Sequence, residues 1–203
     1  MFFLIDKPLG ISSFDVIREL RKSLGIKKMW HTGTLDPLAT WCLLIATDSS
    51  TKLIPLFEWA KKEYIFTVSL DGWTDSLDLW TPLEKIDTST MKVRSDEEIC
   101  SYILSQKEQL PPRYSALHIQ GKRAYELAQA WKEFSLKSRP IKIYTASILS
   151  RTPLSITIEM TISSGGYVRS FAPLLWEFFG ITGGYISQLR RTKIHTPDRK
   201  SVV

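Results

Sequence analysis

The sequence contains little cysteine. Cys42 and Cys100 are its only two cysteines in 203 residues, and neither has a histidine or second cysteine at metal-ligand spacing. A disulfide framework and a zinc site are therefore both disfavoured. This usage fits a reducing compartment, so we expect a cytoplasmic protein that binds no metal.

Long hydrophobic runs are also missing. No segment approaches the length needed to cross a membrane, and the apolar start of the chain is short and interrupted by Asp6, which does not fit a signal peptide. Neither a P-loop nor a dinucleotide fingerprint occurs, which argues against an enzyme with a nucleotide cofactor. We expect no membrane partner and no cofactor.

What is present fits one globular domain. Hydrophobic residues make up 43% and charged residues 24% of the chain, and 203 residues can bury a sizeable core. The net charge of +6 is compatible with a polyanionic partner, but equally with an ordinary lysine-rich surface.

The hydrophobic pattern predicts an α+β fold. Alternating or continuous apolar runs predict strands at residues 2–5, 42–46, 64–70, 141–149, 155–162 and around 189–191. Helical spacing and capping residues predict helices that follow Ser12 and Ser95, a short one at 124–130, and one from Gly165 to Phe179. Because no regular βαβ spacing appears, we expect a mixed, largely antiparallel central sheet flanked by helices.

The most informative segment runs from Trp30 to Trp41. It holds His31 and Asp36 in a loop rich in threonine, glycine and proline, and Pro37 restricts the backbone after Asp36. Asp36 is a candidate nucleophile or base, provided that a cation such as Arg169 keeps it ionised. Tyr64 could exchange a proton or stack on a base. The alternatives are an aspartate that opens a turn before proline and a histidine that is a satisfied polar group.

Basic and aromatic residues are interleaved at four places. These are Arg113-Tyr114, Lys122-Arg123-Ala124-Tyr125, Tyr167-Val168-Arg169 and Leu189-Arg190-Arg191. Cations neutralise phosphates and rings stack on unpaired bases, so the pattern favours looped or single-stranded RNA. Each cluster alone also fits a solvated surface.

Together these residues resemble a known family, the bacterial tRNA pseudouridine-55 synthases, over almost the whole chain. The matching pieces lie at 4–13, 31–40, 62–64, 74–78, 111–117, 121–128, 139–140, 163–170 and 189–192. The resemblance implies that Asp36 is the nucleophile, Arg169 its ion-pair partner, and Tyr64 the ring that stacks on the target base and assists proton transfer. It further implies that His31 expels the target uridine, and that Lys7, Tyr167 and Leu189 line the pocket.

The resemblance implies the isomerisation of uridine 55 in the tRNA T-loop to pseudouridine, by base flipping and covalent action of Asp36 on ribose C1′ or on the uracil ring. It implies no cofactor, and a monomer that binds the tRNA T-arm without a protein partner. Residues 1–203 would form a single pseudouridine synthase catalytic domain with an RNA-gripping insertion at roughly 114–140, and no C-terminal PUA-type domain. The alternative is a T-arm-binding or RNA-folding factor without catalysis.

The sequence departs from the family at its tryptophans. The family has glycine where this chain has Trp30 and Trp41, and the flanks suggest the same at Trp59, Trp80, Trp131 and Trp176. Tryptophan at glycine positions would cause steric strain. Our hypothesis is that UGA codons read as glycine were translated as tryptophan; the alternative is a divergent member whose tryptophans are real.

Overall fold

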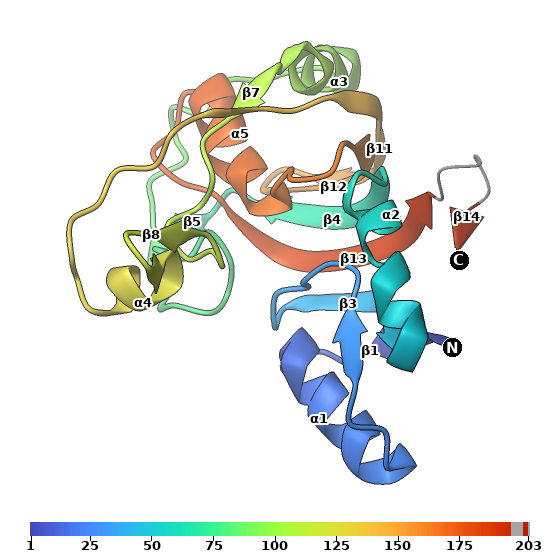
Figure 1. The fold of residues 1–203 in the computed structure, drawn as a ribbon. Helices are drawn as coiled ribbons and strands as arrows, with labels where there is room; N and C mark the ends of the chain where they lie inside the picture. Colours follow the sequence, from blue (N-terminus) through green and yellow to red (C-terminus); the bar gives the residue numbers. More distant parts are fainter. Residues whose placement is uncertain (196–200, 203) are drawn as a thin grey trace.

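The computed structural model describes residues 1–195 and 201–202 and is built around one eight-stranded sheet (Figure 1). Its strands follow the order β1-β3-β13-β4-β12-β11, while β2 pairs with β3 and β14 with β13. The bounds are β1 (Phe2–Lys7), β2 (Met29–His31), β3 (Ala39–Thr47), β4 (Lys62–Ser69), β11 (Ile143–Thr152), β12 (Ser155–Ile162), β13 (Tyr185–His195) and β14 (Ser201–Val202).

The sheet is mixed and largely antiparallel, as predicted. Among the described strands of this sheet only β13 and β3 run parallel, with Leu189 opposite Ala39. In β4, residues with buried and partly exposed side chains alternate, which is the pattern of a strand with one face on the core. The α+β class is therefore confirmed.

The two helices predicted from capping residues begin where the sequence indicated. Helix α1 (Ser13–Leu24) starts with a capping box between Ser12 and Asp15 and ends at Gly25 with φ of 67°, and α3 (Asp96–Ser105) starts with the same device. In Figure 1, α3 and α5 (Phe171–Phe179) lie on the same side of the sheet. Phe171 of α5 packs against Phe66 of β4 at 6.2 Å between ring centroids. Two short helices, η1 (Asp48–Leu53) and α2 (Pro55–Glu58), follow β3.

The predicted start of the helix at Gly165 is wrong. Gly165 has φ of +81°, a left-handed conformation that cannot open a right-handed helix. Tyr167 is extended, and a short 3-10 helix, η2 (Val168–Ser170), precedes α5. Arg169 therefore lies in η2, one turn before the α-helix.

The segment between β7 (Glu108–Gln109) and β10 (Arg139–Pro140) begins and ends at the same place, because these two strands pair with each other in a separate two-stranded sheet. It carries α4 (Ala124–Gln129) and a two-stranded ribbon of β8 (His118–Ile119) and β9 (Lys122–Arg123). Figure 1 shows it standing to one side of the sheet. A separate ribbon joins β5 (Gly72–Trp73) and β6 (Glu84–Lys85).

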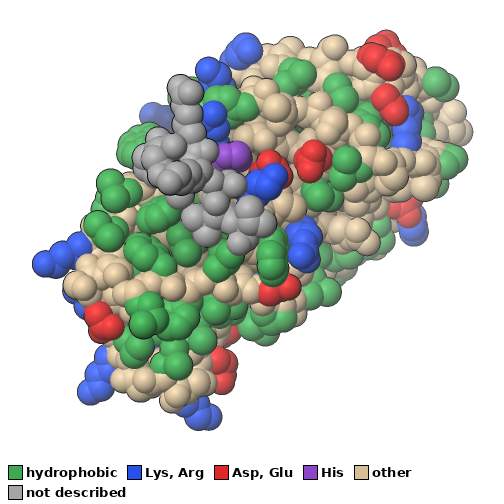
Figure 2. Space-filling model, turned by 90° about the vertical axis from the view of Figure 1, so that its right-hand side faces the viewer, with side chains coloured by type: hydrophobic (Ala, Val, Ile, Leu, Met, Phe, Trp, Pro, Cys, Tyr) green, Lys and Arg blue, Asp and Glu red, His purple; other side chains and the backbone are tan. Residues whose placement is uncertain are grey.

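One face of the molecule is rich in hydrophobic side chains. It is the side that carries α2 and the N-terminus in Figure 1, and Figure 2 shows hydrophobic side chains gathered there. The exposed hydrophobic side chains of the N-terminus, η1, α2 and the residue after α2 are Met1, Leu53, Leu56 and Trp59. In the described part of the chain, no helix has the length and apolar character needed to span a membrane.

Candidate active site

The loop at residues 32–38, between β2 and β3, is held in place by neighbours on two sides. The Ser13 hydroxyl of α1 accepts from the Leu35 N–H at 2.8 Å and donates to the Leu35 carbonyl at 3.1 Å. The Gly10 N–H donates to the carbonyl of Pro37 at 2.9 Å. On the sheet side, Arg191 donates to the carbonyl of Gly33 at 3.1 Å. Asp36 thus projects from a fixed backbone.

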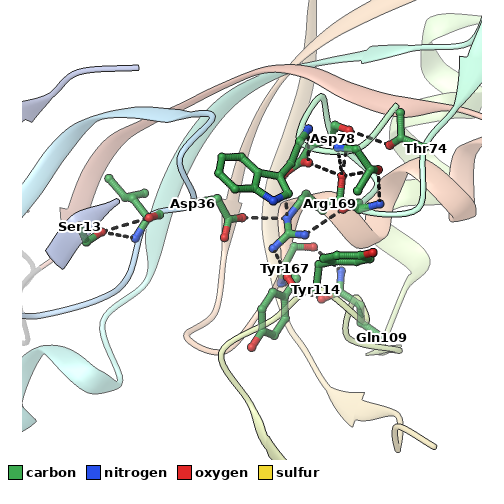
Figure 3. Close-up of polar contacts among 12 residues, drawn as sticks. Ser13, Asp36, Thr74, Asp78, Gln109, Tyr114, Tyr167 and Arg169 are labelled. Carbon is green, nitrogen blue, oxygen red and sulfur yellow. Dashed lines mark hydrogen bonds and ion pairs between the residues drawn. The ribbon is translucent and has the colours of Figure 1, made fainter. Parts of the chain in front are cut away.

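Asp36 forms an ion pair with Arg169, a residue 133 positions away (Figure 3). The distance from Arg169 Nε to Asp36 Oδ2 is 2.8 Å, and a second carboxylate oxygen, from Asp78, lies 3.5 Å from the same nitrogen. The side chains of Arg169 and Asp78 are each 4% exposed, whereas that of Asp36 is 33% exposed. A buried guanidinium therefore holds a carboxylate that is open to a ligand.

Carbonyl groups hold the rest of the guanidinium. Its two terminal nitrogens donate to the carbonyls of Ser76 at 2.8 Å and Tyr114 at 2.7 Å. Burial disfavours the charge of Arg169, but Asp36 and Asp78 outweigh this effect and raise its pKa above the usual value. Arg169 therefore stays charged and fixed in orientation.

Asp36 opens into a cavity of about 390 Å³. Tyr64 of β4 and Leu189 of β13 line it, and both are less than a tenth exposed. Burial raises the pKa of the Tyr64 hydroxyl, an effect that the Arg191 guanidinium opposes. The structure thus brings Asp36, Arg169, Tyr64 and Leu189 together.

Tyr167 lines the same cavity. Its backbone is held by the buried side chain of Gln109, whose amide donates to the Tyr167 carbonyl at 2.8 Å and whose oxygen accepts from the Tyr167 N–H at 2.7 Å. This pair of bonds joins β7 to the turn before η2 and fixes the backbone two residues ahead of Arg169.

His31 lines a neighbouring cavity of about 700 Å³, which meets the first at Asp36. Its ring stacks on Trp30 at 5.4 Å, and its buried Nδ1 has no partner among the described residues. Burial, followed by the charge of Arg191, lowers the pKa of His31 to about 4. The imidazole is therefore neutral at pH 7.

Lys7 has a different place from the one expected. It is fully buried and lines neither cavity. Its ammonium group donates to the carbonyls of Pro8 at 2.8 Å, Ile11 at 2.6 Å and Pro37 at 3.3 Å. The expectation that Lys7 lines the pocket is corrected. Lys7 instead supports the backbone around the loop, because its ammonium group binds these three carbonyls.

The sequence analysis gave no role to Asp78 or to Gln109, which both hold residues of the site in place. Asp78 lies in one of the segments that carry the family resemblance, so a signal was present, but nothing in it indicated contact with Arg169. For Gln109 we find no signal in the sequence. In the described part of the chain, no three His, Cys, Asp or Glu side chains lie together in a group that could hold a metal ion.

The six tryptophans at the expected glycine positions divide into two groups by backbone conformation. Trp41 and Trp131 have φ of 68° and 52°, where a bulky side chain is strained and glycine is favoured. Trp30, Trp59, Trp80 and Trp176 are not among the positive-φ residues. Backbone conformation thus supports the glycine hypothesis at two of the six positions.

The fold and the site together define a class of protein. The chain aligns with a crystal structure of a Cbf5-Nop10-Gar1 complex at a TM-score of 0.69 and 24% identity, over 96% of this chain and 48% of that one. It aligns with human RNA Pseudouridylate Synthase Domain Containing 4 at a TM-score of 0.51 and 12% identity, over 99% and 83% of the two chains. The fold is that of the pseudouridine synthases.

Sequence comparison narrows the class to a family. Residues 21–168 match the model of the TruB family pseudouridylate synthase N-terminal domain, and the chain belongs to this family. It is 39% identical to tRNA pseudouridine synthase B of Aquifex aeolicus over 94% of this chain and 67% of that protein. It is 33% identical to the Thermus thermophilus protein of the same name over 95% and 72%.

Proposed function

We propose that this protein isomerises uridine 55 in the T-loop of tRNA to pseudouridine. The observation that carries the proposal is the open carboxylate of Asp36, paired at 2.8 Å with the buried Arg169, at the mouth of a cavity that contains Tyr64. Relatives that cover nearly the whole chain are named tRNA pseudouridine synthase B, which supports tRNA as the substrate.

The geometry suits a base that has left its stack. A loop nucleotide flips out at a cost of only a few kcal/mol and could enter the cavity with its uracil against the Tyr64 ring. Arg169 pairs with the Asp36 carboxylate and orients it for attack, and the pocket provides an apolar wall through Leu189. Breaking and re-forming the bond between ribose and uracil needs no redox partner and no external group.

We propose that His31 supports base flipping, because it lines the second cavity together with Asp36. A neutral, flat imidazole can take the space that the flipped uridine vacates without carrying charge into the stem. We propose that the basic residues of the 108–140 segment hold the T-arm, with Arg123 and Tyr125 facing this second cavity.

The experiment measures pseudouridine in a T-arm stem-loop incubated with the purified chain alone. We expect turnover by the parent, none by Asp36→Asn, and none when cytidine replaces the target uridine. Because one chain supplies every group of the site, the protein should act as a monomer without a partner protein. T-arm binding without turnover by the parent would instead indicate a non-catalytic RNA-folding factor. Full activity of Asp36→Asn would refute the nucleophile assignment.

A further inference from the structure

The cavity of about 390 Å³ contains two buried cations that the proposed function leaves unused. Lys62 of β4 is 8% exposed and Arg191 of β13 is 1% exposed. Arg191 lies opposite Tyr64 in the antiparallel register, and Lys62 is two residues before Tyr64 on the same face of β4. Both line the cavity beside Tyr64 and Asp36.

Neither cation has a carboxylate partner in the described residues. Lys62 Nζ donates to the carbonyl of Ala60 at 3.1 Å and to the Ser164 hydroxyl at 3.2 Å. Arg191 donates to the carbonyls of Cys42 at 3.0 Å and Gly33 at 3.1 Å. Arg169, by contrast, is neutralised by two carboxylates.

Buried charge without an opposite charge is costly. Here two such charges face one cavity, and both lie near Gly33, where an added Cβ would be 3.4 Å from one Arg191 nitrogen and 3.8 Å from Lys62 Cε. The pair therefore creates a positive potential at the wall against which the base would stack. An anion that forms during the reaction would remove this cost.

We propose that Lys62 and Arg191 stabilise the negative charge that uracil carries once its bond to ribose has broken. The proposal rests on the proposed function and adds two groups that act on the leaving base. A phosphate of the RNA backbone fits less well, because phosphates remain near the mouth of a cavity, while these side chains are almost completely buried.

The chemistry balances without a co-reactant. In the route through C1′, a carboxylate oxygen of Asp36 bonds to C1′ while the C1′–N1 bond breaks, and its electron pair goes to N1 and spreads to O2 and O4. The base turns, C5 bonds to C1′, and the Asp36 carboxylate leaves. C5 then loses its proton and N1 gains one, so the product is an isomer of the substrate.

Substitutions at Lys62 test the proposal. We expect Lys62→Gln to lower the single-turnover rate at saturating T-arm RNA by about 10²-fold, as loss of one preorganised stabilising group does, with little change in the Kd for RNA. Lys62→Arg should recover most of the rate. The matched control is Lys61→Gln, which removes the same charge from an exposed neighbour and should leave the rate near that of the parent.

A pH profile adds a readout that a structural role would not change. Burial, followed by the charge of Arg191, lowers the pKa of Lys62 to about 8. The groups that face Lys62 are Arg191 from β13, Tyr64 from its own strand, Asp36 from the loop and Ser164 from the turn after β12. Parental kcat/KM should fall as pH rises through about 8, and Lys62→Arg should remove this fall.

Two results would overturn the proposal. One is an unchanged saturating rate in Lys62→Gln; a weaker Kd at that unchanged rate would indicate a phosphate contact instead. The other is identical pH profiles for parent and Lys62→Arg. The pH profile of the parent needs no variant to fold. Lack of turnover by the parent itself would instead refute the proposed function.

Discussion

Arg169 serves two carboxylates of different kinds, the open Asp36 and the buried Asp78. The Asp36 side chain is 33% exposed and that of Asp78 only 4%, so we infer that Asp78 mainly fixes the guanidinium and balances its charge. Asp78 is itself held by the Ser76 hydroxyl at 2.6 Å and the Trp80 N–H at 3.0 Å. This arrangement makes Asp78 a positioning residue that acts through Arg169.

Asp78→Asn keeps the shape of the side chain and removes its charge. We expect the single-turnover rate to fall by up to about 10²-fold, because a small displacement of the Arg169–Asp36 pair misaligns the attacking carboxylate. RNA binding should be retained, as measured by the Kd for the T-arm stem-loop. The control is Asp75→Asn, an exposed carboxylate in the same loop. Equal rates in both variants would contradict the positioning role.

Trp131 occupies a position that favours glycine for a reason visible in its hydrogen bonds. After α4, the Lys132 N–H donates to the Leu127 carbonyl and the Trp131 N–H to the Ala128 carbonyl, each at 3.0 Å. This is the Schellman pattern, in which the left-handed residue is usually glycine. Trp131 has φ of 52° and an 81% exposed side chain, so strain is present with little packing to offset it.

We therefore expect Trp131→Gly to raise the free energy of unfolding by about 1 kcal/mol, the cost of a left-handed non-glycine residue, in urea denaturation. Trp59→Gly is the matched control, because Trp59 is 86% exposed with φ of −93° and should give no gain. If both changes act alike, strain at position 131 is not the cause. Glycine at positions 41 and 131 in peptides of the native protein, measured by mass spectrometry, would support the codon hypothesis.

At the scale of single elements, the hydrophobic pattern predicted the main strands, and capping residues located the starts of two helices. The boxes at Ser12–Asp15 and Ser95–Glu98 mark the true starts of α1 and α3. The helix start predicted at Gly165 had no such capping box. It rested on a glycine pair, and Gly165 instead lies in a turn with positive φ. Pairing of Arg169 with Asp36 could not follow from local pattern, since it depends on how η2 and the 32–38 loop meet in space; only the resemblance indicated it.

Because α1 holds the 32–38 loop in place, we expect loss of this contact to lower the single-turnover rate without changing the affinity for RNA. Ser13→Ala removes both hydrogen bonds to Leu35 and leaves a buried backbone N–H and C=O without a partner, at a cost of about 1–3 kcal/mol each. We expect lower stability in urea denaturation and a lower single-turnover rate, with the Kd for the T-arm stem-loop unchanged.

Ser23→Ala is the control for this prediction. Ser23 lies on the same helix and is exposed, and among the described residues its hydroxyl donates to the carbonyl of Glu19 alone. Its loss should change neither the stability nor the rate by more than a small amount. A parental rate in Ser13→Ala would show that the loop holds Asp36 in place without α1.

At the scale of the whole molecule, the acid sensitivity of folding should depend on His31. Its pKa is about 4 in the folded protein because of burial and the charge of Arg191, against about 6.5 in an unfolded chain. Between these values the unfolded state binds more protons, so the free energy of unfolding falls as pH drops from about 6.5 towards 4.

His31→Gln removes this contribution to the pH dependence of stability. Urea denaturation at pH 7 and pH 5 should therefore show a smaller loss of stability for His31→Gln than for the parent. His118→Gln, at an exposed histidine, should behave like the parent, and an equal loss in all three proteins would mean that other groups dominate the acid response.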